Sequence, residues 1–291
     1  MNKLTFFVLV IFIFSVTGGC NNQKKKIDDG FIFDRDQIES EIKKSPIYLF
    51  PSPGEILNQF YAAELSYNEE LLHDPTQYTD YVTYREKGLN LGIYITDLAY
   101  ASLFSRNTIV SEYLDVVRKL SSELDVATTA FESLAERIGT NVGNRDSLIV
   151  LSNEAFNNVL EFLETAGREN TIALISSGAY IEAMYLALYS LEEYDEEHPI
   201  LQQISELKYP LENLLKQAES VSGDPNVEGI LVYIRELDKI YNELESESTI
   251  ASVEEPGVIT LSGGSLPHIT EENFYMIRRS VLATRAYIVG N

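Results

Sequence analysis

The chain has 291 residues, an apolar fraction of 45% and a strong excess of acid, with 45 acidic and 22 basic side chains. That apolar fraction is enough for an ordinary buried core, which excludes a wholly disordered chain. From residue 46 onward there are 15 basic and 39 acidic side chains, a net charge of −24. A phosphate backbone or an anionic membrane surface would repel such a body, so nucleic acid is excluded as a partner and membrane attachment needs a separate device.

The first 20 residues are typical of a secretory signal. One early charge, Lys3, is followed by an apolar run over residues 4–16 and then by three small residues and Cys20. A short basic end, an apolar stretch of about a dozen residues and small residues before a cleavage site make up such a signal. Cys20 is the only cysteine in the chain, so it cannot form an internal disulfide and needs another role.

The residues around Cys20 resemble the lipobox of bacterial lipoproteins. Gly18, Gly19 and Cys20 match it, whereas Thr17 stands in place of the more usual leucine. The resemblance implies that residues 1–19 are removed and that Cys20 is lipidated with two or three acyl chains, which together give stable anchoring. It also implies the outer membrane, because Asn21 is not the aspartate associated with inner-membrane retention. An ordinary signal peptide or a retained anchor is the alternative to lipidation.

The remainder reads as a polar tether over residues 20–45 and a single acidic all-α domain over residues 46–291. Ser52 lies in a Pro-rich entry that is typical of a helix cap, and Asn144 or Asp146 can cap a later helix. Residues 249–262 are the one place where a small β-hairpin is expected. The apolar periodicity predicts a multi-helix bundle or short helical array of about nine helices, over residues 53–72, 85–105, 107–124, 127–139, 145–167, 170–192, 199–222, 226–246 and 270–288.

Two of these helices are apolar on every side, which predicts burial in a protein core or in a membrane. Residues 89–104 contain Asp97 as their only charge, and residues 172–191 contain Glu182 as theirs. The second is long enough for a membrane span, but a charge at mid-bilayer argues against one. The two helices share a Gly-x-Tyr-Ile stretch 86 residues apart, for which both internal duplication and chance stay open. Gly88 and Gly92 are spaced for close helix packing.

Asp97 and Glu182 are the candidate catalytic residues. An ionised carboxylate in an apolar helix is costly unless it is paired, so each acid needs a partner. If the two helices pack together, the carboxylates share a site and at least one pKa is raised, as in general acid–base catalysis. Tyr100 and Tyr185, three residues beyond each acid, are candidate ligand-binding residues together with Arg145 and Arg168. The alternative is structural, with each acid bonded to tyrosine hydroxyls or to an arginine such as Arg145 or Arg168.

The sequence contains little that indicates a metal site, a nucleophilic catalyst or a phosphate-binding loop. Glu70 with His73, and Asp195 with His198, are the only Glu-x-x-His-like pairs, and both lie at helix ends. A bundle metal site needs more ligands than these, so no metal and no cofactor are expected. The chain also lacks a nucleophile-elbow motif and a Gly-rich phosphate loop.

Four stretches together resemble a family of functionally uncharacterised bacterial lipoproteins. They are Phe50-Pro51-Ser52-Pro53, the stretch from Gly92 to Ala101, Asn144-Arg145-Asp146-Ser147-Leu148, and Gly178-Ala179-Tyr180-Ile181-Glu182. The resemblance covers residues 46–220 and implies an exported helical domain, but it supplies no activity. We therefore expect a lipid-anchored, non-catalytic accessory or interaction protein of the cell envelope, with an envelope protein as its partner. The alternative is a protein that binds a small molecule or a glycan in a pocket around Asp97 and Glu182. Hydrolysis of the bound molecule is a further option within this alternative.

Overall fold

The computed structural model describes residues 50–126, 128–244 and 268–290, all within one compact unit that spans Lys43–Asn291. Every regular element in these residues is helical, with ten α-helices and no strand, so the predicted all-α class is confirmed. The predicted signal peptide, Cys20, the tether and the hairpin over residues 249–262 lie outside the described residues. In chain order the elements are α2 (Pro53–Ala62), the 3₁₀ helices η2 (Glu69–Leu71) and η3 (Pro75–Asp80), α3 (Tyr84–Leu103), α4 (Asn107–Glu123), α5 (Thr129–Thr140), α6 (Arg145–Thr165), α7 (Glu169–Tyr189), α8 (Ile200–Glu206), α9 (Lys208–Ser220), α10 (Pro225–Glu243) and α11 (Glu271–Val289).

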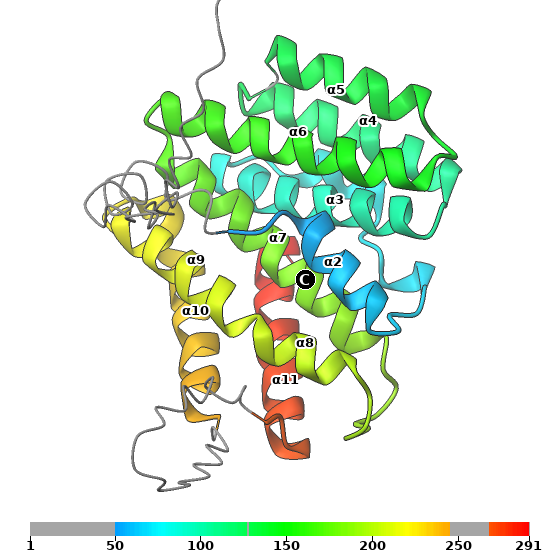
Figure 1. Cartoon of the computed structure of the whole chain (residues 1–291). Helices are drawn as coiled ribbons and strands as arrows, with labels where there is room; N and C mark the ends of the chain where they lie inside the picture. Colours follow the sequence, from blue (N-terminus) through cyan, green and yellow to red (C-terminus); the bar gives the residue numbers. More distant parts are fainter. Residues whose placement is uncertain (1–49, 127, 245–267, 291) are drawn as a thin grey trace, which may run out of the picture. The chain divides into compact units, whose positions relative to one another are not determined.

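Helices α3 and α7 form the centre of this unit, with α4, α5 and α6 on one side and α8 to α11 on the other (Figure 1). Every residue of α3 from Gly88 to Leu103 is buried, and so is α7 from Thr171 to Leu188 except Tyr185. Helix α7 is the one described helix that is long and apolar enough to cross a membrane, yet 94% of its apolar window is buried inside the protein. Burial in the protein core therefore explains the apolar surface of α7.

The two central helices touch backbone to backbone at a pair of glycines. A Cβ atom added to Gly178 would lie 1.9 Å from the carbonyl oxygen of Leu89, and one added to Gly92 would lie 2.1 Å from that of Ile175. Neither position has room for a side chain, so the predicted role of Gly92 in close packing is confirmed. Tyr84 also bonds to Thr171 near the start of both helices. Contacts in the same order along both helices mean that α3 and α7 run parallel.

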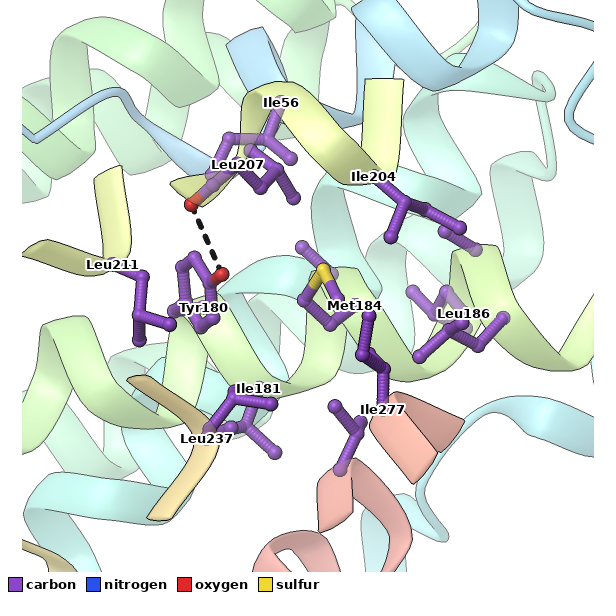
Figure 2. Close-up of a cluster of buried hydrophobic side chains, with 14 of the residues drawn as sticks. Ile56, Tyr180, Ile181, Met184, Leu186, Ile204, Leu207, Leu211, Leu237 and Ile277 are labelled. Carbon is purple, nitrogen blue, oxygen red and sulfur yellow. Dashed lines mark hydrogen bonds between the residues drawn. The ribbon is translucent and has the colours of Figure 1, made fainter. Parts of the chain in front are cut away.

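The core continues on both sides of this pair as two clusters of buried apolar side chains. Figure 2 shows the larger cluster around Met184, where side chains from α7, α8, α9, α10 and α11 converge. The hydroxyl of Tyr180 donates to the carbonyl oxygen of Leu207 at 3.1 Å, which satisfies the one polar atom of a fully buried ring. Each large apolar side chain buried in this way contributes about 1.5–3 kcal/mol to folding.

Most predicted helix boundaries agree with the structure to within a few residues, but two are wrong. The helix predicted over residues 53–72 begins as expected, with a capping box between Ser52 and Glu55, and then ends at Ala62. Glu64 follows with a φ of 68°, a left-handed backbone that cannot continue an α-helix. The connecting segment, residues 63–83, then holds only the two 3₁₀ helices.

The helix predicted over residues 199–222 is divided into α8 and α9 at Leu207, whose ψ of −2° departs from α-helical geometry. The physical reason is Pro210, which has no N–H to donate and whose ring would collide with the carbonyl of residue 206. Asn144 caps α6, its side chain accepting a hydrogen bond from the Ser147 N–H at 3.1 Å.

Candidate functional site

The parallel packing of α3 and α7 brings Asp97 and Glu182 together at the centre of the protein. Both side chains are completely buried. The prediction that the two helices pack together and that the carboxyl groups share a site is therefore confirmed. Their common partner comes from α11, where Arg285 donates to Glu182 through Nε at 2.6 Å and through Nη2 at 3.0 Å. A two-pronged contact of this kind is the strongest form of arginine–carboxylate pair.

The surroundings of Asp97 favour its neutral, protonated form. Burial and the neighbouring charge of Glu182 raise the pKa of Asp97 well above its usual range, although Arg285 opposes the shift. Its Oδ2 accepts a hydrogen bond from the His73 N–H at 3.1 Å, and its Oδ1 has no donor among the described residues. A neutral carboxyl group leaves less unpaired charge at this buried atom than a carboxylate would. With Asp97 in its neutral form, the two acids and Arg285 together carry no net charge.

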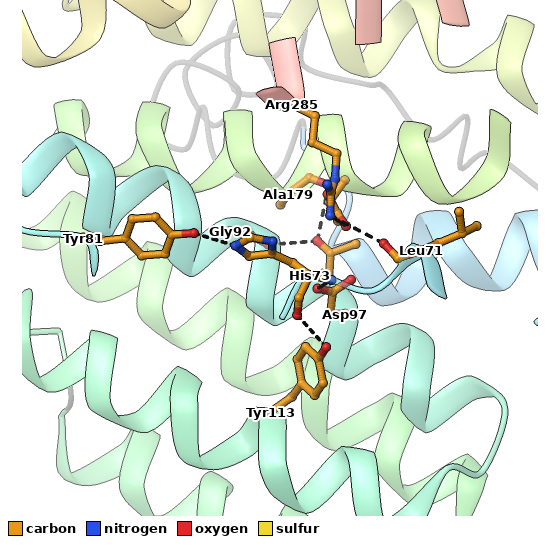
Figure 3. A network of polar contacts seen from close by, with 10 residues as sticks. Leu71, His73, Tyr81, Gly92, Asp97, Tyr113, Ala179 and Arg285 are labelled. Atoms are coloured by element: carbon orange, nitrogen blue, oxygen red, sulfur yellow. Dashed lines mark hydrogen bonds and ion pairs between the residues drawn. The ribbon is translucent and has the colours of Figure 1, made fainter. Parts of the chain in front are cut away.

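Arg285 remains a cation in this setting. Its burial lowers its pKa, but the charge of Glu182 and the hydrogen bonds to it outweigh that effect and raise the pKa above the ordinary value. The guanidinium also lies 4.1 Å from the ring centre of Tyr185, and its side chain is only 12% exposed. Figure 3 shows Arg285 directed from α11 toward the Asp97 region and the backbone of Leu71.

The connecting segment, residues 63–83, closes over the cluster. His73 is buried, and its Nε2 is hydrogen-bonded to the Tyr81 hydroxyl (Figure 3). Burial, and next the charge of Arg285, lower the pKa of His73 to about 4, so this imidazole is neutral at neutral pH. Burial raises the pKa of Tyr81 to about 12, so the phenol keeps its proton. The pair is thus neutral and places no further charge in the core.

Phenols from the helices hold the connecting segment in place. Tyrosines of α3 and α4 donate to three of its carbonyl oxygens, namely Tyr94 to Asp74 at 2.9 Å, Tyr100 to Ser66 at 2.8 Å and Tyr113 to His73 at 2.6 Å. The Asn68 N–H also donates to the Tyr100 hydroxyl at 2.8 Å. A segment without a regular ladder of its own thereby satisfies its backbone with buried side chains.

Of the candidate ligand-binding residues, only Tyr185 joins the carboxyl cluster. Tyr100 points to the connecting segment instead of Asp97. The expectation that Arg145 or Arg168 pairs with the acids is wrong. Arg168 donates to the Tyr84 hydroxyl and to the Leu124 carbonyl, each at 2.7 Å, and Arg145 lies over the ring of Tyr61 at 4.5 Å.

The residues that sequence reasoning missed are Arg285 and His73 in its role beside Asp97. A partial signal for Arg285 exists, because it lies four residues after Val281, beside the inward stripe of α11 formed by Phe274, Ile277, Val281 and Ile288. Arg278 lies beside the same stripe, so the pattern alone does not select Arg285. His73 carries no comparable signal, since its place depends on the irregular path of residues 63–83.

The cluster has the components of general acid–base chemistry, namely two carboxyl groups, a raised pKa at Asp97 and a fixed cation. Such chemistry also requires a substrate within hydrogen-bond reach, and both acids are completely buried. In this conformation the cluster is an internal, neutral hydrogen-bonded unit. A cavity of about 270 Å³ reaches Tyr81, whose ring lies on the far side of His73 from Asp97.

The described part of the chain contains no group of three or more histidine, cysteine or acidic side chains that could hold a metal ion. His73 is engaged with Tyr81, and His198 Nδ1 accepts from the Ile200 N–H at 3.3 Å. One ring nitrogen of each of these two histidines is therefore already engaged.

Comparison of the chain with protein-family models, with curated proteins and with solved structures found no match. The resemblance to a family of bacterial lipoproteins stays a prediction from the residues themselves.

Proposed function

We propose that the chain is a lipid-anchored protein of the bacterial cell envelope, whose acidic helical domain binds an envelope partner and catalyses no reaction itself. The observation that supports this most directly is the complete burial of Asp97 and Glu182 behind Arg285 and the connecting segment. These acids were the best catalytic candidates in the sequence. Sealed in the core, they contribute to its architecture and not to a reaction with solute.

The anchoring half of the proposal rests on Cys20 and the apolar run before it. A body with a net charge of −24 has no electrostatic attraction to an anionic leaflet, so lipid would supply the attachment. We place the anchor in the outer membrane.

The anchor is tested by expressing the full chain and its Cys20→Ser variant in bacteria fed with labelled palmitate. We expect the label and membrane fractionation for the wild type alone, and a mature N-terminal peptide that begins at a lipidated Cys20. A wild-type protein that is unlabelled and fractionates with the variant would overturn the anchoring half.

The partner is tested by cross-linking the lipidated protein in its native envelope, with Cys20→Ser as the matched control. We expect one stoichiometric partner that depends on anchoring. If cross-linking recovers nothing above the control, the interaction half of the proposal fails.

The alternative function, a ligand-binding or hydrolytic pocket around Asp97 and Glu182, would require the connecting segment to open. One observation favours keeping it as a candidate, since η3 within that segment contributes no buried residue and its displacement exposes little core. It is tested by screening envelope metabolites and glycans against the wild type and against Asp97→Asn and Glu182→Gln. Binding that both variants lose while staying folded would favour the pocket over the interaction protein.

A further inference from the structure

A cluster of aromatic rings lies where α2 and α3 end, away from the carboxyl pair. The ring centres of Tyr61 and Tyr67 lie 5.4 Å and 5.3 Å from that of Phe104, so Phe104 joins the two tyrosines. Tyr61 is 39% exposed. Glu64 and Ser105, next to the ends of the two helices, both have left-handed φ angles, of 68° and 56°. The backbone is thus bent into uncommon conformations on both sides of this cluster.

Two arginines lie on these rings. The guanidinium of Arg106 is 4.2 Å from the ring centre of Tyr67, and that of Arg145 is 4.5 Å from the ring centre of Tyr61. We name the five residues Tyr61, Tyr67, Phe104, Arg106 and Arg145 the arginine–tyrosine face. Contact with an aromatic ring fixes a guanidinium in place while it leaves N–H groups at the edge of the plane free to donate.

The charges of these two arginines are poorly compensated. Within the described residues Arg106 forms no ion pair, and Arg145 approaches only its neighbour Asp146, at 4.0 Å. The Nε of Arg145 is buried and has no hydrogen-bond partner there. Three other arginines have acids at closer range, with Arg118 at 2.9 Å from Glu132, Arg235 at 3.1 Å from Glu219 and Arg137 at 3.5 Å from Glu154. Arg85, Arg168, Arg278 and Arg279 also form no ion pair within the described residues. The five residues are distinguished by two arginines on one aromatic cluster that both lack an acid closer than 4.0 Å, one of them with a buried, unpartnered Nε.

We propose that the arginine–tyrosine face is the docking site for an acidic segment of a partner protein. The two arginine edges would each take a carboxylate in bidentate fashion, and an apolar side chain between the carboxylates would contact Tyr61 and Phe104. This inference rests on the proposed function, because it names the surface through which the domain binds its partner.

Charge complementarity and composition select this occupant. Carboxylates match the two uncompensated guanidiniums, and tyrosine with arginine is the side-chain pairing that dominates protein–protein hot spots. A sugar ring would need an open tyrosine face for stacking, whereas Arg145 and Arg106 already lie over Tyr61 and Tyr67. A second copy of the chain is disfavoured, because two bodies of net charge −24 repel one another.

The test uses the full chain with Cys20→Ser for solubility and an array of short synthetic peptides that place glutamates on either side of a phenylalanine. Matched peptides carry glutamine in place of glutamate. The double variant Arg106→Gln/Arg145→Gln is compared with Arg137→Gln/Arg235→Gln, which removes the same charge from two arginines that have acidic partners. Circular dichroism and thermal melting check that both variants are folded.

We expect the glutamate peptides to bind the parent protein above their glutamine counterparts. The double variant of the face should lose about tenfold or more in affinity, and the control pair less than about twofold. Equal losses in the two variants would show diffuse electrostatics and overturn the proposal. So would binding of acidic polysaccharide such as polygalacturonate without binding of any acidic peptide.

The cross-linking experiment separates this inference from the proposed function. If the native envelope yields a partner that the Arg106→Gln/Arg145→Gln variant also captures, the interaction role stands and the docking site lies elsewhere. If no partner is recovered by either protein, the proposed function itself fails.

Discussion

Arg285 determines the energetics of the buried carboxyl cluster, because it supplies two hydrogen bonds and a positive charge to Glu182. Removing one member of a buried ion pair costs more than the pair contributes, since the other charge is left without compensation. Asp97 differs from Glu182 in this respect. Its raised pKa favours a neutral side chain that accepts one hydrogen bond from the His73 N–H, and an amide can do the same.

We therefore predict that Arg285→Met lowers the free energy of unfolding at pH 7 by about 3–5 kcal/mol, because it leaves Glu182 buried without a cation. Asp97→Asn should cost less than about 1.5 kcal/mol, since it preserves a neutral hydrogen-bonding side chain. Urea denaturation followed by circular dichroism measures both.

The double variant Glu182→Gln/Arg285→Met is the control, because it removes both charges. It should recover much of the stability that Arg285→Met loses. An Asp97→Asn protein as unstable as Arg285→Met would contradict the neutral form of Asp97 that its raised pKa favours.

His73 should make the domain less stable in acid. Its pKa is about 4 in the folded protein and 6.5 in the unfolded chain, so the unfolded chain binds more protons between these pH values. The stability that this lowered pKa provides is complete above pH 6.5 and is lost as the pH falls toward 4. The expected loss over this window is about 3 kcal/mol.

The measurement compares the wild type with His73→Gln by urea denaturation at several pH values between 4 and 7. The raised pKa of Asp97 acts with the opposite sign, since its contribution is lost as the pH rises, but it is present in both proteins and cancels. A stability difference between the two proteins that stays constant with pH would refute the prediction.

At the scale of elements, the contact between α3 and α7 depends on Gly92 and Gly178. We predict that Gly178→Ala destabilises the protein by more than about 3 kcal/mol, because its Cβ would lie 1.9 Å from the Leu89 carbonyl oxygen and the helices would have to separate. Gly139→Ala in α5 is the matched control. Its Cβ would meet nothing closer than 3.7 Å, so alanine should stabilise by up to about 1 kcal/mol. Thermal melting distinguishes them, and a tolerated Gly178→Ala would disprove the close contact.

The sequence predicts these elements well where periodicity alone decides them. The wholly apolar patterns of α3 and α7 require burial, and two lone acids in such helices require each other or a cation. The division between α8 and α9 could also have been predicted from the sequence, because a proline such as Pro210 breaks an α-helix when it lies in the helix interior. The path of residues 63–83 could not be predicted from the sequence. Tyrosine hydroxyls from α3 and α4 hold this segment, and those contacts exist only after folding. Arg285 lies 103 residues beyond Glu182, and no local pattern joins them.

At the scale of the whole molecule, the folded state has to accommodate the mutual repulsion of many acidic side chains. Exposed acids cluster where α7 is followed by α8, at Glu192, Glu193, Asp195, Glu196 and Glu197. Like charges at an exposed surface repel one another, and the repulsion weakens as salt shortens the screening length from about 30 Å at 0.01 M to about 8 Å at physiological ionic strength. The compact state suffers from this repulsion more than the expanded chain does.

We predict that the free energy of unfolding rises with sodium chloride between about 0.01 and 0.3 M, by an amount on the order of 1 kcal/mol. The variant Glu192→Gln/Glu193→Gln/Glu197→Gln should be more stable at low salt and should respond less to added salt. Its matched control is Glu132→Gln/Glu154→Gln/Glu219→Gln, which removes as much charge from acids that pair with Arg118, Arg137 and Arg235. Those acids lie beside cations, so their removal should bring no comparable gain. If both triple variants gain equally, net charge alone limits the stability of the domain and the placement of its acids does not.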